Sequence, residues 1–218
     1  CDLIKPSIII SHGFAALLTQ RKRSMKTTSV ELPNNDAIQM MHVGKDTYTM
    51  TREQFIINDD IVVGTENYLE FSVLGGEVYF ITKNHVLVKT SAPDFLEKIV
   101  EGVSPILTMR TSSERIAAIA IDGNIFIITR EGIEKYCGDF IDAAISNEKC
   151  VAIDTCGEAF LVENKGVKPF YSNHFIKTVA VCGNTICLYF TPNKMIIMRE
   201  GSESIEKDID FSVEFSFS

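Results

Sequence analysis

One pattern written twice, between Ile106 and Phe170, constrains the fold of this chain more than any other feature. A shift of 34 residues superposes the two copies without a gap, so that Ile106–Met109 falls on Phe140–Ala143, Ile116–Ile119 on Cys150–Ile153 and Ile125–Ile128 on Ala159–Val162. The turn residues Gly123 and Gly132 recur in the same phase as Gly157 and Gly166. Apolar strands and glycine turns that repeat in phase indicate a repeat architecture.

The same layout extends along the chain in both directions. His174–Met198 repeats it after the two copies. Before them, the pattern predicts short strands at Ala37–Val43, Asp46–Thr51, Gln54–Ile57, Ile61–Val63, Tyr68–Leu74, Glu77–Thr82 and His85–Lys89. We assign the first three of these strands to one short repeat, and Ile61–Val63 to the start of the next.

One repeat is longer than the others. Gly76 lies 47 residues before Gly123, and the extra length falls in Ser91–Gly102. Within this stretch, Pro93–Val100 predicts a short helix inserted between two repeats.

The two ends of the chain each carry part of a repeat. Phe211–Phe217 alternates apolar and polar residues with a period of two and lies where the first strand of another repeat should begin. Phe14–Thr19 is typical of a second strand, but no complete repeat precedes it. Pairing between these two segments would complete one sheet from both ends and close a ring, which removes exposed strand edges.

These features predict an all-β fold, a small closed β-propeller of about six short blades that occupies residues 1–218 as a single domain. The ring would be closed by pairing of the N- and C-terminal strands. The alternative is a β-sandwich or a Greek-key barrel, which also has many short strands. That alternative predicts neither gapless repeats nor a matched part of a repeat at each end.

The charge of the chain restricts its partners. The formal net charge is -8 at pH 7, which argues against direct nucleic-acid binding, because that needs Lys and Arg gathered on one face. One basic cluster, Arg21, Lys22 and Arg23, stands apart and is either a solvated hairpin tip or a contact to an acidic partner. Acidic residues such as Asp59 and Glu131 are either solvated edges or a rim that attracts a basic partner.

The cysteines indicate the compartment. The chain has six, with no CxxC pair, and their placement in strands and turns fits small buried residues in a reducing environment rather than disulfides or zinc ligands. No apolar run reaches the roughly 18 residues of a membrane span. We therefore expect a cytoplasmic or nuclear protein that binds no membrane, metal or cofactor.

Three segments carry a resemblance to a known family. Ser11–Thr19 looks like the first half of a repeat in which a glycine turn leads into a strand ending in Ala-Leu-Thr, and Ala117–Phe126 and Ser72–Tyr79 look like its second half. This repeat resembles that of the regulator of chromosome condensation (RCC1-like) propellers. The chain departs from the family in having no tryptophan, and the family's Trp-Gly is replaced by pairs such as Ile128-Thr129. A WD40-like propeller is the alternative.

The sequence contains no convincing catalytic set. His12, His42, His85 and His174 are far apart, and no HExxH, Walker or GxSxG motif occurs. The turns of a propeller gather on one face, so a combined metal or proton-transfer site stays an alternative to four structural histidines.

We therefore expect a non-catalytic protein-interaction module or adaptor within a larger intracellular assembly. Phe95, Leu96 and Glu97, in the inserted segment, are the candidate partner-binding residues together with the basic cluster, since binding residues concentrate on loops of rigid scaffolds. The alternative is that Phe95 and Leu96 simply pack over the edge of a blade. The resemblance implies two other roles, nucleotide exchange on a small GTPase or support of tRNA and translation-factor modification. A propeller hydrolase or small-ligand binder is a further alternative, and it would need carboxylates or histidines in the central channel.

Overall fold

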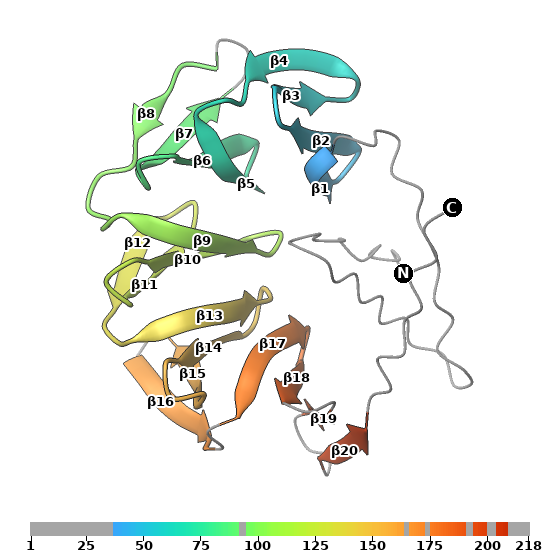
Figure 1. Ribbon diagram of the computed structural model, residues 1–218, viewed down its shortest axis with the longest axis vertical. Coiled ribbons are helices and arrows are strands. Elements are labelled where there is room, and N and C mark those ends of the chain that lie inside the picture. The colour runs from blue at the N-terminus through green and yellow to red at the C-terminus, as the bar shows by residue number, and fades with distance from the viewer. Residues whose placement is uncertain are drawn as a thin grey trace. The chain divides into compact units, whose positions relative to one another are not determined.

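The computed structural model describes residues 37–91, 95–163, 166–172, 175–190, 194–199 and 204–208. Within these ranges the chain is all-β, with twenty strands and no helix. The strands form five antiparallel four-stranded sheets, and within each sheet they follow one another in chain order (Figure 1). The described residues therefore contain no helix that could cross a membrane.

The chain divides into two compact units, which we call unit 1 (Cys1–Ile99) and unit 2 (Val100–Ser218). The first sheet of unit 1 consists of β1 (Ala37–Val43), β2 (Asp46–Thr51), β3 (Gln54–Ile57) and β4 (Asp60–Gly64). The second consists of β5 (Tyr68–Leu74), β6 (Glu77–Thr82), β7 (Leu87–Ser91) and β8 (Lys98–Ile99).

Unit 2 contains the other three sheets. Its first sheet consists of β9 (Ile106–Thr111), β10 (Ile116–Ala120), β11 (Ile125–Ile128) and β12 (Ile133–Tyr136). The second consists of β13 (Phe140–Ile145), β14 (Cys150–Asp154), β15 (Ala159–Glu163) and β16 (Gly166–Tyr171). The third consists of β17 (Ile176–Cys182), β18 (Thr185–Phe190), β19 (Lys194–Arg199) and β20 (Ile205–Asp208).

The structure confirms the 34-residue repeat. The sheets β9–β12 and β13–β16 are the two copies, and their second-to-third-strand turns contain Gly123 and Gly157 with φ of 79° and 77°. Each glycine N–H donates to a carbonyl three residues earlier, Gly123 to Ala120 at 3.0 Å and Gly157 to Asp154 at 3.1 Å. Identical turns at equivalent positions show that the sequence repeat is a structural repeat.

A β-bulge recurs in the first strand of all five described sheets. In each case one residue is left out of the pairing with the second strand, and these unpaired residues are Ile38, Leu69, Leu107, Ile141 and Lys177. Such an extra residue bends a strand and increases its twist. The bulge shifts the alternation of buried and exposed residues by one position. It was not predicted, because the inserted residue is itself apolar in four of the five sheets and hides this shift in the sequence.

The boundary assigned after Gln54–Ile57 was wrong. The strand at Asp60–Gly64 belongs to the first sheet, where it pairs with β3, and does not begin the next repeat. Asn58 and Asp59 have φ of 49° and 73°, so they form a two-residue turn with two left-handed residues, which returns the chain at once as a hairpin. The repeat that was predicted to contain only three strands is therefore a complete four-stranded sheet.

The predicted helix at Pro93–Val100 is also wrong for the residues described. Phe95 has φ of 47°, outside the helical region, and Lys98 and Ile99 form the strand β8. Ile99 pairs with Val88 and Lys98 with Lys89. Pairing with the open edge of β7 outweighs the helix propensity of this short segment.

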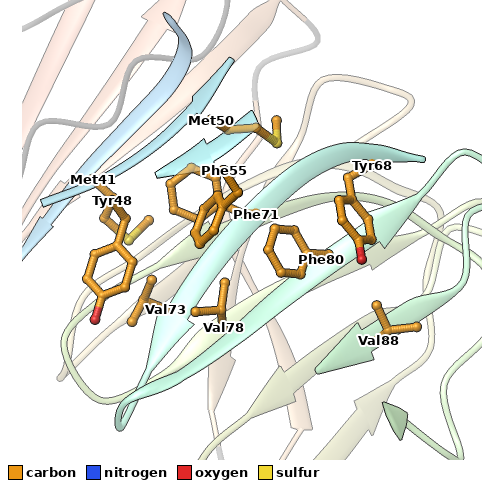
Figure 2. Packing of buried hydrophobic residues seen from close by; sticks show 10 residues of the cluster. All are labelled: Met41, Tyr48, Met50, Phe55, Tyr68, Phe71, Val73, Val78, Phe80 and Val88. Carbon is orange, nitrogen blue, oxygen red and sulfur yellow. The ribbon is translucent and has the colours of Figure 1, made fainter. Parts of the chain in front are cut away.

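The core of unit 1 lies between its two sheets and is rich in aromatic rings (Figure 2). Phe55, from the first sheet, contacts Phe71 and Phe80 of the second with ring centroids 4.9 Å apart in both pairs and interplanar angles of 75° and 78°. All three rings are fully buried. Edge-to-face pairs of this kind contribute about 0.5–1.5 kcal/mol each beyond their burial.

The middle sheet of unit 2 is buried on both faces. Ala152 packs into a cluster with β10 and β11, whereas its neighbours Val151 and Ile153 pack into a second cluster with β17 and β18. Because neighbouring residues of a strand point to opposite faces, an apolar run such as Val151–Ile153 requires a sheet on either side. Small residues in these strands allow the sheets to approach closely.

The predicted closing strands, Phe14–Thr19 and Phe211–Phe217, lie outside the described residues. Closure of a ring, a sixth blade and a single domain over the whole chain therefore stay predictions.

Candidate interaction surfaces

Phe95, Leu96 and Glu97 precede the outer strand of the second sheet. Phe95 is partly buried and packs against the aromatic core of unit 1, which anchors the segment, and its predicted role in partner binding stays a prediction. Leu96 has 69% of its surface exposed, and so does Ile99, which the sequence analysis did not identify. The part of the segment available to a partner is therefore Leu96 and Ile99, which we call the Leu96–Ile99 edge.

Glu97 holds this segment in place. Its carboxylate accepts a hydrogen bond from the hydroxyl of Tyr68, a buried residue of β5 that stacks on Phe80. Burial, together with the bond to Glu97, raises the pKa of Tyr68 far above its ordinary value. The phenol therefore stays protonated at neutral pH and keeps donating.

Charged side chains on β6 and β7 stabilise the strand beside this edge. Lys89 forms an ion pair with Glu77 at 2.9 Å, and its hydrogen bond lowers the pKa of Glu77. Lys98 of β8 lies opposite Lys89 in the strand pairing. The basic cluster of Arg21, Lys22 and Arg23 lies outside the described residues, and its role stays a prediction.

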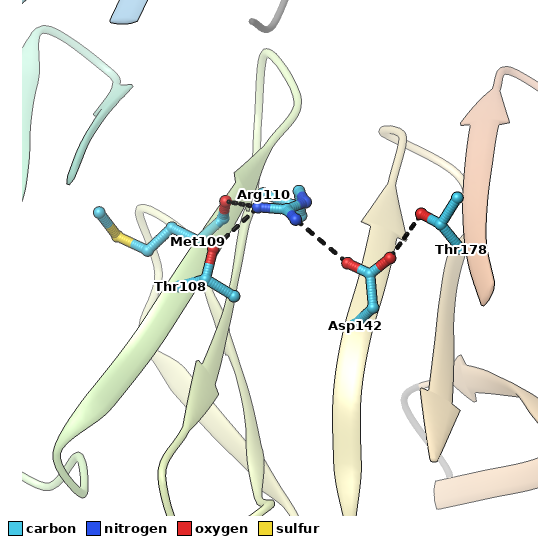
Figure 3. Close-up of polar contacts among 5 residues, drawn as sticks. All are labelled: Thr108, Met109, Arg110, Asp142 and Thr178. Atoms are coloured by element: carbon cyan, nitrogen blue, oxygen red, sulfur yellow. Dashed lines mark hydrogen bonds and ion pairs between the residues drawn. The ribbon is translucent and has the colours of Figure 1, made fainter. Parts of the chain in front are cut away.

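A polar line links the first strands of all three sheets of unit 2 (Figure 3). Asp142 on β13 accepts from Arg110 of β9 at 3.1 Å and from the hydroxyl of Thr178 of β17 at 2.6 Å. Arg110 also donates to the hydroxyl of Thr108 at 2.8 Å and to the carbonyl of Met109 at 2.9 Å.

This line joins the sheets. Both oxygens of Asp142 have partners on neighbouring strands, and its side chain is only 16% exposed. A largely buried carboxylate held in this way stabilises the strand arrangement, because its removal leaves the arginine without its counter-ion. The line was not predicted, since its three members lie 32 and 36 residues apart along the chain.

The first-to-second-strand turns of unit 2 are also bonded to one another. Ser113 and Asn147, which are 34 residues apart, are joined by side-chain hydrogen bonds of 2.7–3.0 Å. Arg115 donates from its guanidinium to the carbonyl of Ser146, and the Ser146 hydroxyl donates to the carbonyl of Gly183 at 3.2 Å. Equivalent turns of successive sheets are thus locked together at one end of the unit.

The histidines do not form a site within the described part of the chain. His42 lies near the end of β1, where its Nδ1 is 2.9 Å from the hydroxyl of Thr47, and His85 lies in the left-handed turn before β7. His12 and His174 lie outside the described residues. Among the residues described, no three His, Cys, Asp or Glu side chains are grouped so that they could hold a metal ion.

One open depression lies on the first sheet of unit 1. Met40 and Ile56 are among its lining residues, together with His42, Thr49 and Asp59 from the strands and the β3–β4 turn. It offers an apolar surface with a few polar groups, among them His42 and Thr47, which are hydrogen-bonded to each other.

The cysteines are all free thiols in the part that the structure describes. Cys150 and Cys187 are buried in strands, as expected from their apolar surroundings. The thiols of Cys137, Cys156 and Cys182 are exposed, so the prediction of small buried residues applies to only two of these five.

No protein-family model and no curated protein sequence matches this chain. Solved structures do resemble it. PorZ of Porphyromonas gingivalis matches with a TM-score of 0.55 at 11% identity, over 83% of this chain and 27% of that one. Hsv2 of Kluyveromyces lactis matches with a TM-score of 0.55 at 12% identity, over 76% of this chain and 60% of that one.

A third similar structure is that of S. cerevisiae Dbp5 bound to Nup159, Gle1, IP6 and ADP, with a TM-score of 0.55 at 8% identity, over 75% of this chain and 57% of that one. In all three cases the chain covers less than two thirds of the solved chain. Identities this low show the fold alone. The four-stranded antiparallel sheets therefore form a propeller-like fold similar to that of Nup159 and Hsv2.

Proposed function

We propose that this chain is a non-catalytic protein-interaction module that acts as an adaptor in a larger intracellular assembly, in the cytoplasm or the nucleus. The observation that carries the proposal is the Leu96–Ile99 edge. Two large aliphatic side chains, each 69% exposed, are presented by a segment that is held by Phe95 in the core and by Glu97 on Tyr68.

The construction of this edge suits binding. An interface anchor contributes most when it is apolar and already ordered, because less conformational entropy is lost on association. Covering one such aliphatic side chain contributes about 1.5–3 kcal/mol. Leu96 and Ile99 together would then change the affinity for a partner by about 100-fold or more.

The experiment is affinity purification of the intact chain from its native cells, followed by mass spectrometry, with the double variant Leu96→Asp/Ile99→Asp compared in parallel. The matched control is Ile205→Asp, since Ile205 is 54% exposed on the outer strand β20. We expect partners retained by the wild type and the control to be lost from the double variant. Equal recovery from all three proteins would contradict the proposal.

The RCC1-like resemblance supports a second candidate, regulation of a small GTPase through nucleotide exchange. Its specific support is the hairpin of β10 and β11 around Asp122 and Gly123, which has the layout of the family's repeat. Selective recovery of a small GTPase that is released on addition of GTP would favour this candidate. Recovery of a tRNA- or translation-factor-modifying enzyme would favour the accessory role.

A further inference from the structure

The bulge position of the first strands carries exposed aliphatic side chains. Four of the five described sheets have Ile or Leu at this position, and the exposed fractions are 42% for Ile38, 44% for Leu69, 49% for Leu107 and 47% for Ile141. The fifth sheet has Lys177. A side chain that is left out of the strand pairing and is about half exposed to water adds little to folding stability by being apolar. Folding alone therefore does not account for this pattern.

In unit 2, two more exposed apolar side chains lie at the same end of the sheets. Ile121 is 56% exposed in the turn after β10, and Phe175 is 66% exposed immediately before β17. With Leu107 and Ile141 they define what we call the sheet-end patch.

Backbone hydrogen bonds bring these residues together. The N–H of Ile121 donates to the carbonyl of Pro105 at 2.8 Å, which places it beside the start of β9. The N–H of Phe140 donates to the carbonyl of Gly123 at 2.9 Å, which places the start of β13 against the same turn. The third sheet is joined to β13 by the bond from Thr178 to Asp142. The patch therefore draws on all three sheets of unit 2.

Exposed carboxylates lie within the patch. Asp122 follows Ile121 directly, and Asp139 is two residues before Ile141. Lys177 is an exposed cation on the neighbouring first strand. Hydrogen bonding from Ser104 and from Asn124 lowers the pKa of Asp122, so its carboxylate is charged at neutral pH. The net charge of -8 on the whole chain adds to the attraction of these carboxylates for a cationic ligand, whereas Lys135, which lies near Asp122, opposes it.

We propose that the sheet-end patch docks a segment of a partner protein in which large apolar side chains are combined with lysine or arginine. Its apolar side chains would cover Leu107, Ile141 and Phe175, and its cations would lie against Asp122 and Asp139. This surface uses different residues from the Leu96–Ile99 edge, so the inference goes beyond the proposed function and does not depend on it.

The test uses a phage-displayed library of random short peptides as the probe, selected on the purified intact chain. The double variant Leu107→Asp/Ile141→Asp is the counter-selection, and Ile133→Asp on the outer strand β12 is the matched control. Thermal melting verifies that each variant is folded, which is expected because the substituted side chains are about half exposed. We expect enriched peptides to carry a net positive charge and at least one large apolar residue.

Binding constants for the enriched peptides then decide the outcome. We expect Kd to rise at least about tenfold for Leu107→Asp/Ile141→Asp and about threefold for Asp122→Asn/Asp139→Asn, and to stay unchanged for Ile133→Asp. Enrichment of neutral or acidic peptides, or equal binding by the first double variant, would overturn the proposal. Self-association of the wild type that the same double variant abolishes would also overturn it, because a second copy would then cover the patch.

Discussion

Gly123 shows how much a single position depends on the sheet next to it. Its φ is 79°, and a Cβ built on it would lie 2.8 Å from the carbonyl oxygen of Gly138 and 2.9 Å from the Cα of Asp139, which are backbone atoms that cannot rotate away. The Asp122-Gly123 pair predicted the turn. The close approach could not be predicted, because Gly138 and Asp139 belong to the connection into the following sheet.

We predict that Gly123→Ala lowers the free energy of unfolding by more than about 3 kcal/mol, through left-handed strain and the backbone clash together. The control is Gly183→Ala, also in a turn of unit 2, with φ of 54° and no atom within 4 Å of the added Cβ. That variant should lose only about 1 kcal/mol. Urea unfolding measures both, and equal losses would show that the close approach contributes nothing.

Asp142 is the residue on which the polar line depends. We predict that Asp142→Ala lowers the free energy of unfolding by about 1–3 kcal/mol, because Arg110 loses its counter-ion and Thr178 its acceptor. Glu206→Ala is the control, since Glu206 pairs with Lys194 on an outer strand where both side chains are more than half exposed. Such pairs contribute about 0–1 kcal/mol. A loss no larger for Asp142→Ala than for the control would contradict a linking role.

At the scale of strands, the hydrophobic period predicted most elements and missed those that depend on pairing. The strands at Ala37–Val43 and Tyr68–Leu74 begin and end as expected, because alternation and turn residues are local signals. Asp60–Gly64 was assigned to the wrong repeat, since sequence does not show which edge a strand joins. The segment before Ile99 was expected to be helical, because helix propensity can be read from the segment alone. Its pairing with β7 depends on the fold and cannot be read in this way.

The candidate site shows the same difference between features that local sequence signals predict and features that depend on contacts in the folded chain. The extra length of the inserted segment drew attention to Leu96, which is exposed, and its part in binding stays a prediction. The packing of Phe95 against the aromatic core is a contact that only the folded chain could reveal. The sheet-end patch was missed because its members come from three sheets.

The cysteines give a test of which strands are buried. We predict that Cys137, Cys156 and Cys182 react quickly with an alkylating reagent, whereas Cys150 and Cys187 react only on unfolding. Burial raises the pKa of the Cys150 thiol to about 12 and also raises that of Cys187, so almost no thiolate is present at neutral pH. Peptide mapping by mass spectrometry assigns each site, and fast labelling of Cys150 in the native protein would contradict the packing of β14.

The same shift has a consequence at alkaline pH. The ordinary pKa of the Cys150 thiol is 9.0, and the folded value is about 12, so the unfolded chain loses this proton first. The stability that the protonated Cys150 thiol contributes to the folded state is fully present below pH 9 and is lost as the pH rises toward 12. The stability of Cys150→Ala should therefore fall less steeply than that of the wild type over this interval, and parallel curves would mean that the thiol is not desolvated.

At the scale of the whole molecule, one structural question is how the sheet edges of a propeller-like fold are covered. An open propeller would expose unpaired strand edges. The segments Phe14–Thr19 and Phe211–Phe217, outside the described residues, both have the sequence pattern of strands. Pairing between them, which would cover such edges, stays a prediction that mutations can test.

We predict that Phe215→Ser lowers the free energy of unfolding by about 2–4 kcal/mol, while Glu214→Gln, one residue earlier, changes it by less than about 0.5 kcal/mol. The reason is the period of two in this segment, which in a closing strand would put Phe215 on the buried face and Glu214 on the opposite face. A double-mutant cycle with Leu17→Ala should be non-additive by more than about 0.5 kcal/mol if the two terminal strands share one sheet. Equal effects of the two single variants would mean that this segment does not pack as a strand, and strict additivity with Leu17→Ala would mean that the ring is not closed by these two strands.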